Sequence, residues 1–220
     1  MSESQAVDTL INRLSRELRP VRRLAPPWAR TALWMGAAMC LAAPLSYLAD
    51  FRALAVRLMA VPDMWLSELG AFLTAVTAAY AAFLTSVPGR SRLAPLIPVP
   101  AVFMWISAST VGCLRLSAIP GTVAEPMMHP VMCLNVLLLV SVPLGVLLTW
   151  FLARAYPLRP GLTAGLAGLA SAGAAACLLS LIHPYDATAE DLIVHFAAVL
   201  VVVAVTRVFG GRWIARREKA

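Results

Sequence analysis

Charged residues are scarce in this chain of 220 residues. Asp, Glu, Lys and Arg together make up 13% of it, whereas an average soluble domain has about 25%. Apolar residues make up 60%, and the mean hydropathy is +0.80. This composition excludes a disordered chain, and it leaves too few polar residues to coat a soluble core. It predicts a protein whose apolar surface faces a lipid bilayer.

Charge is also missing from the middle of six apolar runs. Each run has the roughly 20 residues that a helix needs to cross about 30 Å of hydrocarbon. We therefore expect an all-α polytopic membrane protein, built as a six-transmembrane-helix bundle over residues 31–209. The expected spans are Thr31–Ala49, Leu66–Leu84, Ala94–Gly112, Val131–Leu152, Gly161–Ile182 and Leu192–Phe209. Residues 1–30 form a separate N-terminal segment, and residues 210–220 form a short basic tail.

Basic residues are distributed unevenly between the two sides of the expected membrane. Of the 18 Lys and Arg residues, fifteen fall on one side: fourteen in the two terminal segments and the loops of that side, and Arg207 at the end of the last expected span. The other side has only Arg52, Arg57 and Arg115. The positive-inside rule then predicts a bacterial inner-membrane protein with both termini in the cytoplasm. Because membrane anchoring explains the net charge of +7, we expect no direct contact with nucleic acid.

The N-terminal segment carries an amphipathic helix, expected from near Ser2 to just before Pro20. Five apolar residues fall within about 100° of one another on a helical wheel: Val7, Leu10, Ile11, Leu14 and Leu18. A basic, proline-rich linker follows and leads to Trp28. The apolar stripe is typical of a helix that docks into a groove on a protein partner, that lies on the anionic inner leaflet, or that folds back on the bundle.

Enzyme and carrier signatures are missing. The centres of the expected spans hold no Asp, Glu, Lys or Arg, although transporters usually keep ionisable groups there. The sequence also lacks a glycine-rich nucleotide loop, an HExxH pair and a GxSxG motif. We therefore predict a non-enzymatic protein.

Sulfur and imidazole groups gather at the outer face of the expected bundle. This candidate sensing set comprises Cys113, Cys133, Cys177, His129, His183, Asp186 and His195. A thiol pair could switch between disulfide and dithiol, or Cys133, His129 and His183 could hold a transient metal. No CxxC or HxxxH pair is present, so each cysteine could equally be a small buried apolar residue. The segment from His183 to Asp186 could equally be a turn that caps the last span. No resident cofactor is expected.

Five short motifs, in order along the chain, resemble the NrsF-type anti-sigma factors, a family of six-span membrane proteins. They are Arg19-Pro-Val-Arg-Arg-Leu-Ala-Pro-Pro-Trp28, Val87-Pro-Gly-Arg90, Pro130-Val-Met-Cys133, Leu158-Arg-Pro160, and His183-Pro-Tyr-Asp186 followed by His195. The resemblance covers nearly the whole chain.

The resemblance implies that the cytoplasmic stripe binds an extracytoplasmic-function (ECF) sigma factor and releases it when redox or metal stress acts outside. It also makes Cys133 the first candidate for the sensing residue. Some family members carry a second cysteine directly after the histidine at 183, where this chain has Pro184. A second cysteine such as Cys113 or Cys177, a metal site, or another stimulus would then be needed. The alternative is a small metal or solute carrier with a His, Met and Cys mouth.

Overall fold

The structure is a computed structural model. It describes residues 3–17, 24–60, 62–89, 91–118, 130–181 and 189–217. Within these residues all the regular structure is helical. The α-helices are α1 (Glu3–Glu17), α2 (Pro27–Leu45), α3 (Phe51–Ala60), α4 (Pro62–Thr85), α5 (Val99–Ala118), α6 (Pro130–Leu152), α7 (Pro160–Ser180), α8 (Ala189–Val205) and α9 (Gly211–Arg217). Two short 3-10 helices are η1 (Ser46–Leu48) and η2 (Ala94–Leu96), and a π-helical turn, η3 (Thr206–Gly210), joins α8 to α9.

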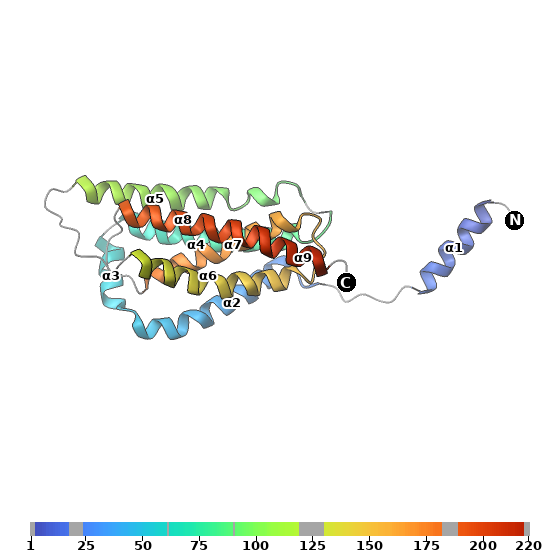
Figure 1. Cartoon of the computed structure of the whole chain (residues 1–220), viewed down its shortest axis with the longest axis horizontal. Coiled ribbons are helices and arrows are strands. Elements are labelled where there is room, and N and C mark those ends of the chain that lie inside the picture. Colours follow the sequence, from blue (N-terminus) through green and yellow to red (C-terminus); the bar gives the residue numbers. More distant parts are fainter. Residues whose placement is uncertain are drawn as a thin grey trace.

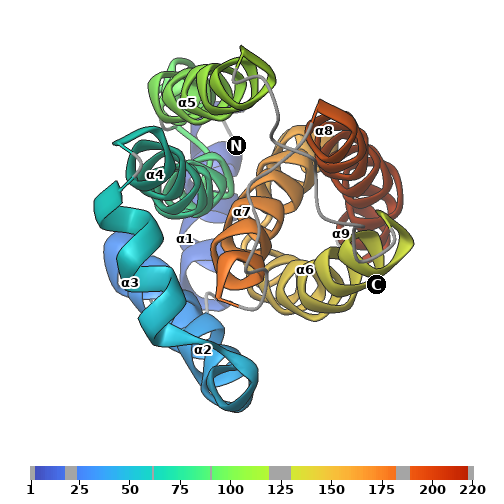
Figure 2. The same ribbon diagram turned by 90° about the vertical axis from the view of Figure 1, so that its left-hand side faces the viewer.

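The long helices form a bundle with α7 near its centre. Helices α4, α5, α6, α7 and α8 run along the long axis (Figure 1). Seen end-on, α4, α6 and α8 surround α7, while α5 packs on α4 and α2 packs on α4 and α6 (Figure 2). The short helix α3 crosses the bundle at one end, and α1 lies apart from it (Figure 1).

Small residues explain the central position of α7. A Cβ atom added at Gly168 would lie 2.9 Å from the Cα atom of Val203 on α8. One added at Gly173 would lie 2.9 Å from the carbonyl oxygen of Ala71 on α4. The glycines therefore let two neighbouring backbones approach α7 closely, as small residues commonly do between helices in membranes.

The rest of the core is aliphatic. Helix α4 contributes a face of buried alanines together with Phe83, and α6 contributes buried leucines such as Leu137, Leu144 and Leu148. Small and large side chains thus meet across the helix contacts and fill the interior, with a few buried hydroxyls such as those of Thr74, Thr163 and Ser171 among them. This core fixes the relative positions of the helix ends that carry the candidate site.

Five helical segments are long and apolar enough to cross a membrane. They are Asp63–Thr85, Ala94–Arg115, Leu134–Leu152, Pro160–Ser180 and Leu192–Arg217. These confirm the all-α polytopic class and coincide with the last five expected spans. The first expected span, Thr31–Ala49, falls on α2 and η1. Helix α2 also includes Arg30 and contains Pro44, and it is not among the five segments, so the count of six is not confirmed. The last segment continues beyond the expected end at Phe209 to Arg217.

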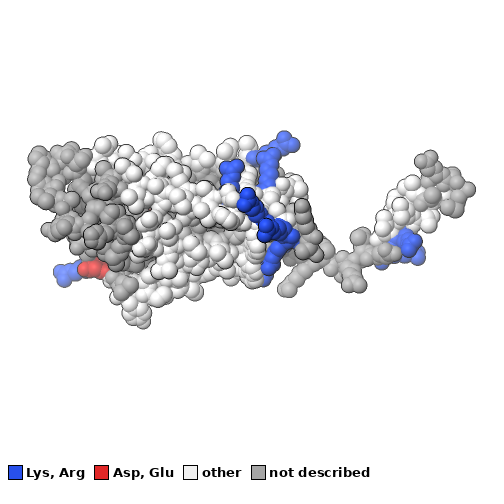
Figure 3. Space-filling model, in the orientation of Figure 1, with Lys and Arg blue, Asp and Glu red and all other residues white. Residues whose placement is uncertain are grey.

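The two ends of the bundle differ in charge. Helix α2 begins and α9 ends at the same end (Figure 1), and most of the visible Lys and Arg side chains gather there (Figure 3). We call this the basic end; its described arginines are Arg30, Arg92, Arg154, Arg159, Arg207, Arg212, Arg216 and Arg217. The opposite end, where α3 lies, carries Arg52 and Arg115 together with Asp50 and Asp63 among the described side chains.

Candidate functional site

The apolar stripe of α1 is uncovered. Val7, Leu10, Ile11 and Leu14 have exposed fractions between 50% and 57%. Their spacing of three and four residues places them along one face of the helix. Leu18, the fifth expected member, lies outside the described residues. Four exposed aliphatic side chains in a row form a surface that a partner or a lipid layer can bury.

The other face of α1 is polar and partly bonded within the helix. The Thr9 hydroxyl donates to the carbonyl oxygen of Gln5 at 2.7 Å, and the Ser15 hydroxyl donates to that of Asn12 at 3.0 Å. Arg13 and Arg16 are exposed beside them. The helix is thus amphipathic in three dimensions, and its apolar stripe remains available for an intermolecular contact.

A buried arginine near the start of α2 contacts the ends of α4 and α6 at the basic end of the bundle. Arg30 is only 9% exposed. Its Nη2 donates to the carbonyl oxygen of Phe151 at 2.9 Å, its Nη1 donates to Ser86 Oγ at 3.5 Å, and its guanidinium lies 4.3 Å from the ring centroid of Phe83. One turn further along α2, the Nε1 of fully buried Trp34 donates to the carbonyl oxygen of Leu144 at 3.1 Å. We call these contacts the Arg30–Trp34 anchor.

The anchor was not expected from the sequence. Arg30 counts there only as one more basic residue of the N-terminal segment. Its hydrogen-bond partners, Ser86 directly after α4 and Phe151 on α6, lie 56 and 121 positions away, so no local pattern identifies them. The anchor joins the helix that directly follows the linker from α1 to the ends of two other helices.

At the opposite end, α4 is tied to both α5 and α7. Asp63 forms an ion pair with Arg115 of α5, and the hydroxyls of Ser67 and Ser109 are 2.7 Å apart. The Cys177 thiol on α7 donates to the backbone carbonyl of Glu68 at 3.7 Å. Polar contacts thus concentrate where the sequence places the sensing set.

The sensing set is only partly described. Cys113 is buried on α5, Cys177 is half-buried on α7, and both are free thiols. His195 is half-buried on α8. Cys133 lies in the first turn of α6, but its side chain is outside the described residues, as are His129, His183 and Asp186. No three described His, Cys, Asp or Glu residues are grouped so that they could hold a metal.

The helical bundle, its apolar spans and its separate amphipathic helix define the class: a polytopic α-helical membrane protein with an uncovered amphipathic helix. Residues 14–215 match the model of one family, described as NrsF, negative regulator of sigma F. The chain therefore belongs to the NrsF family of negative regulators of a sigma factor. No curated protein and no solved structure matches it. The family match begins within α1, so Val7, Leu10 and Ile11 precede it.

Proposed function

We propose that this protein is an inner-membrane anti-sigma factor that holds an ECF sigma factor through α1. A redox or metal stress acting at the opposite end of the bundle releases the sigma factor. The observation that carries this proposal is the uncovered apolar stripe of α1, next to a bundle whose own interior is filled. A regulator needs one surface for its partner and a separate body that anchors it in the membrane.

The distribution of arginine supports the proposed orientation. Cytoplasmic loops of inner-membrane proteins are enriched in Lys and Arg, and the basic end carries most of the described arginines. With this end in the cytoplasm, α1 can meet a sigma factor. The opposite end then faces the periplasm, where thiol oxidation is possible.

Helix α4 offers a route between the two ends. It contacts the Cys177 thiol and pairs with Arg115 near its start, and Phe83 near its other end lies against Arg30 of the Arg30–Trp34 anchor. A shift of α4 would therefore move the start of α2 and the linker that follows α1. A coupling of about 1–3 kcal/mol would change sigma affinity roughly 5–150-fold.

The sensing role falls first on Cys133, with Cys113, Cys177 and the three histidines as candidate partners. Soft sulfur and imidazole ligands suit Zn and Cu(I), and a thiol pair suits oxidation to a disulfide. Either reaction would link the helix ends that carry these residues.

Sigma binding is tested with the full chain in lipid nanodiscs and purified ECF sigma factors of the source bacterium. We expect wild type to retain one of them, and a Leu10→Asp, Leu14→Asp variant to lose it, because charge cannot enter an apolar groove without a large desolvation cost. The matched control is Asn12→Asp, Ser15→Asp, which adds the same two charges to the polar face. Equal retention by the stripe and control variants would refute the proposal.

A further inference from the structure

A groove runs along the outside of the bundle between α6 and the continuous helix formed by α8, η3 and α9. Its volume is about 390 Å³, within the range of about 300–1,000 Å³ usual for ligand sites. Gly145 and Gly210 lie among its lining residues, and Val146, Val205 and Phe209 are exposed along it. The function proposed above does not use this groove.

Close packing beneath the groove requires its two glycines. A Cβ atom at Gly145 would lie 3.2 Å from Ser171 Oγ on α7, and one at Gly210 would lie 3.2 Å from Cγ2 of Thr149. Larger residues at these positions would have to displace such neighbours or fill the space. The glycines therefore let α6 approach α7, and η3 approach α6, closely along the groove.

The π-helical turn η3 forms one wall. Three of its five residues, Thr206, Phe209 and Gly210, line the groove. A π turn is rare and occurs frequently at functional sites, because it departs from regular α-helical hydrogen bonding. Its coincidence with the groove is a second, independent indication that a ligand binds here.

The occupant must come from the bilayer. Both walls belong to segments that can span the membrane, Leu134–Leu152 and Leu192–Arg217. Val146 is 64% exposed and Phe209 is 65% exposed, so the groove opens sideways to the outside of the bundle. A ligand that enters from this direction has an elongated, apolar body.

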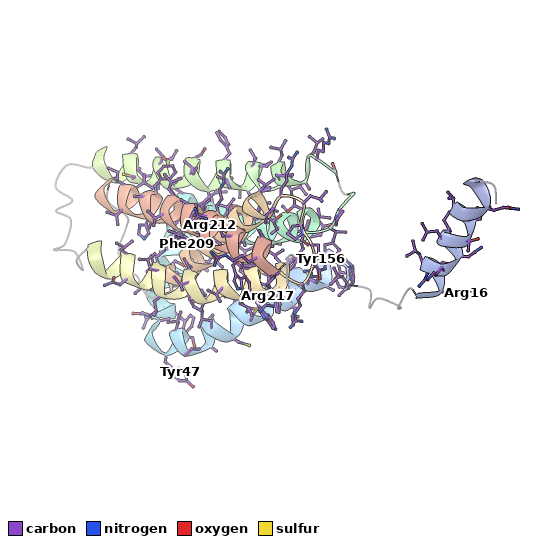
Figure 4. All side chains as sticks on the ribbon, turned by 45° about the vertical axis from the view of Figure 1, so that its right-hand side comes forward. Arg16, Tyr47, Tyr156, Phe209, Arg212 and Arg217 are labelled. Carbon is purple, nitrogen blue, oxygen red and sulfur yellow. The ribbon has the colours of Figure 1, made fainter. Side chains whose placement is uncertain are left out.

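The end of the groove nearest the basic end is cationic and aromatic. Trp213 lines it, and the guanidinium of Arg217 lies 4.8 Å from the ring centroid of Trp213. Phe209, Arg212 and Arg217 follow one another along this helix towards the basic end (Figure 4). Tryptophan and arginine are typical of headgroup depth, and basic residues beside grooves between membrane helices attract anionic lipid headgroups.

We infer that the groove binds an anionic phospholipid, with one acyl chain along α6 and η3 and the phosphate held by Arg217. A guanidinium suits a phosphate because it can donate two parallel hydrogen bonds. A second copy of the chain fits less well, because a two-fold axis along the membrane normal would place the two α9 helices at the same depth. Their arginines Arg212, Arg216 and Arg217 would then repel one another.

The experiment is native mass spectrometry of the detergent-purified full chain, with phosphatidylglycerol and phosphatidylcholine of identical acyl chains. We expect one phosphatidylglycerol to remain bound to wild type and phosphatidylcholine to be lost more readily. Val146→Phe, Val205→Phe fills the groove and should abolish retention of both lipids. Its matched control, Val99→Phe, Val111→Phe, makes the same changes at exposed positions of α5 and should retain lipid as wild type does.

The headgroup contact is tested separately, by a variant that leaves the groove intact. Arg217→Gln should weaken phosphatidylglycerol retention about fivefold, the effect of one basic residue near an anionic surface, and leave phosphatidylcholine unchanged. Arg92→Gln, on the loop before α5, is its control. Equal retention of the two lipids by wild type, unchanged retention by the groove-filled variant, or a lipid-free dimer would each overturn the inference. None of these results depends on whether a sigma factor binds.

Discussion

Helices α1 and α7 both have apolar surface, but that of α7 is buried within the bundle and that of α1 is exposed. Most of α7 is buried within the bundle, and glycine and alanine bring its backbone against α4 and α8. The apolar side chains of α1 are large, aligned and exposed. Small residues therefore mark the helix that packs within the chain, and a stripe of large aliphatic residues marks the helix that the proposed function assigns to the sigma factor. Substitutions in the two helices should separate stability from binding.

The largest effect is expected in α7. Gly168→Leu would force a side chain against the backbone of Val202 and Val203, where even a Cβ atom lies 3.1 and 2.9 Å away. We expect a loss of about 3 kcal/mol in the free energy of unfolding, the upper part of the range for overpacking. Thermal unfolding in detergent measures it. Gly36→Leu is the control, since no atom lies within 4 Å of a Cβ there; equal destabilisation by both would contradict the packing argument.

The next effect concerns the Arg30–Trp34 anchor, which connects the two regions. Arg30→Gln removes a charged hydrogen bond to the Phe151 carbonyl and the contact with the Phe83 ring. The expected loss of stability is about 2 kcal/mol, typical of hydrogen bonds to charged groups. Chemical denaturation of the purified protein tests this. Arg92→Gln, at an exposed residue of the same end, should have no effect, and an unchanged midpoint for Arg30→Gln would show that the anchor adds no stability.

A smaller change in α1 should affect binding alone. Leu10→Ala removes part of the exposed stripe, and sigma affinity should fall about tenfold, which corresponds to about 1.4 kcal/mol. Titration of a sigma factor onto nanodiscs holding the full chain gives the dissociation constant. The thermal unfolding of the bundle should stay at the wild-type value. A lower unfolding temperature with an unchanged dissociation constant would show that Leu10 contributes to stability and not to binding, which would contradict the contrast between α1 and α7.

Cys133→Ser should change neither stability nor the unstimulated affinity for a sigma factor. We expect it to abolish the response of a sigma-dependent reporter to oxidant or metal, because serine provides no thiolate. Cys40→Ser, at an exposed cysteine of α2, should leave the response intact. A normal response in the Cys133→Ser strain would remove this residue from the mechanism.

Local patterns predicted the fold class and α1 well. Apolar runs identify helices because a membrane span needs a fixed length, and the period of the stripe identifies α1 because each helical face repeats every three to four residues. The short helix α3 was not expected, since its ten residues are interrupted by Arg52 and Arg57. The turn η3 was missed because it lies inside an apolar run that already predicts a helix.

Long-range contacts account for the rest of what the sequence did not reveal. The sequence alone suggests that Arg30 is an ordinary solvated charge. Its burial is explained by its contacts with the carbonyl of Phe151, the hydroxyl of Ser86 and the ring of Phe83. Cys177 likewise bonds to the backbone of Glu68, 109 positions away. Such pairs follow from helix packing. The sequence therefore places the candidate residues at an end of the bundle without specifying which of them meet.

The π-helical turn η3 allows the groove to change without a change in the packing of the helix bundle. Such a turn closes its hydrogen bond one residue later than an α-helical turn, so it accommodates a single inserted residue without shifting the helix on either side. Deleting one residue of Thr206–Gly210 should give an uninterrupted α-helix in which Gly211 still packs against Gly161, where a Cβ atom would lie 2.9 Å from the neighbouring Cα. Insertion or loss of one codon could therefore create or erase this groove during evolution while the bundle persists.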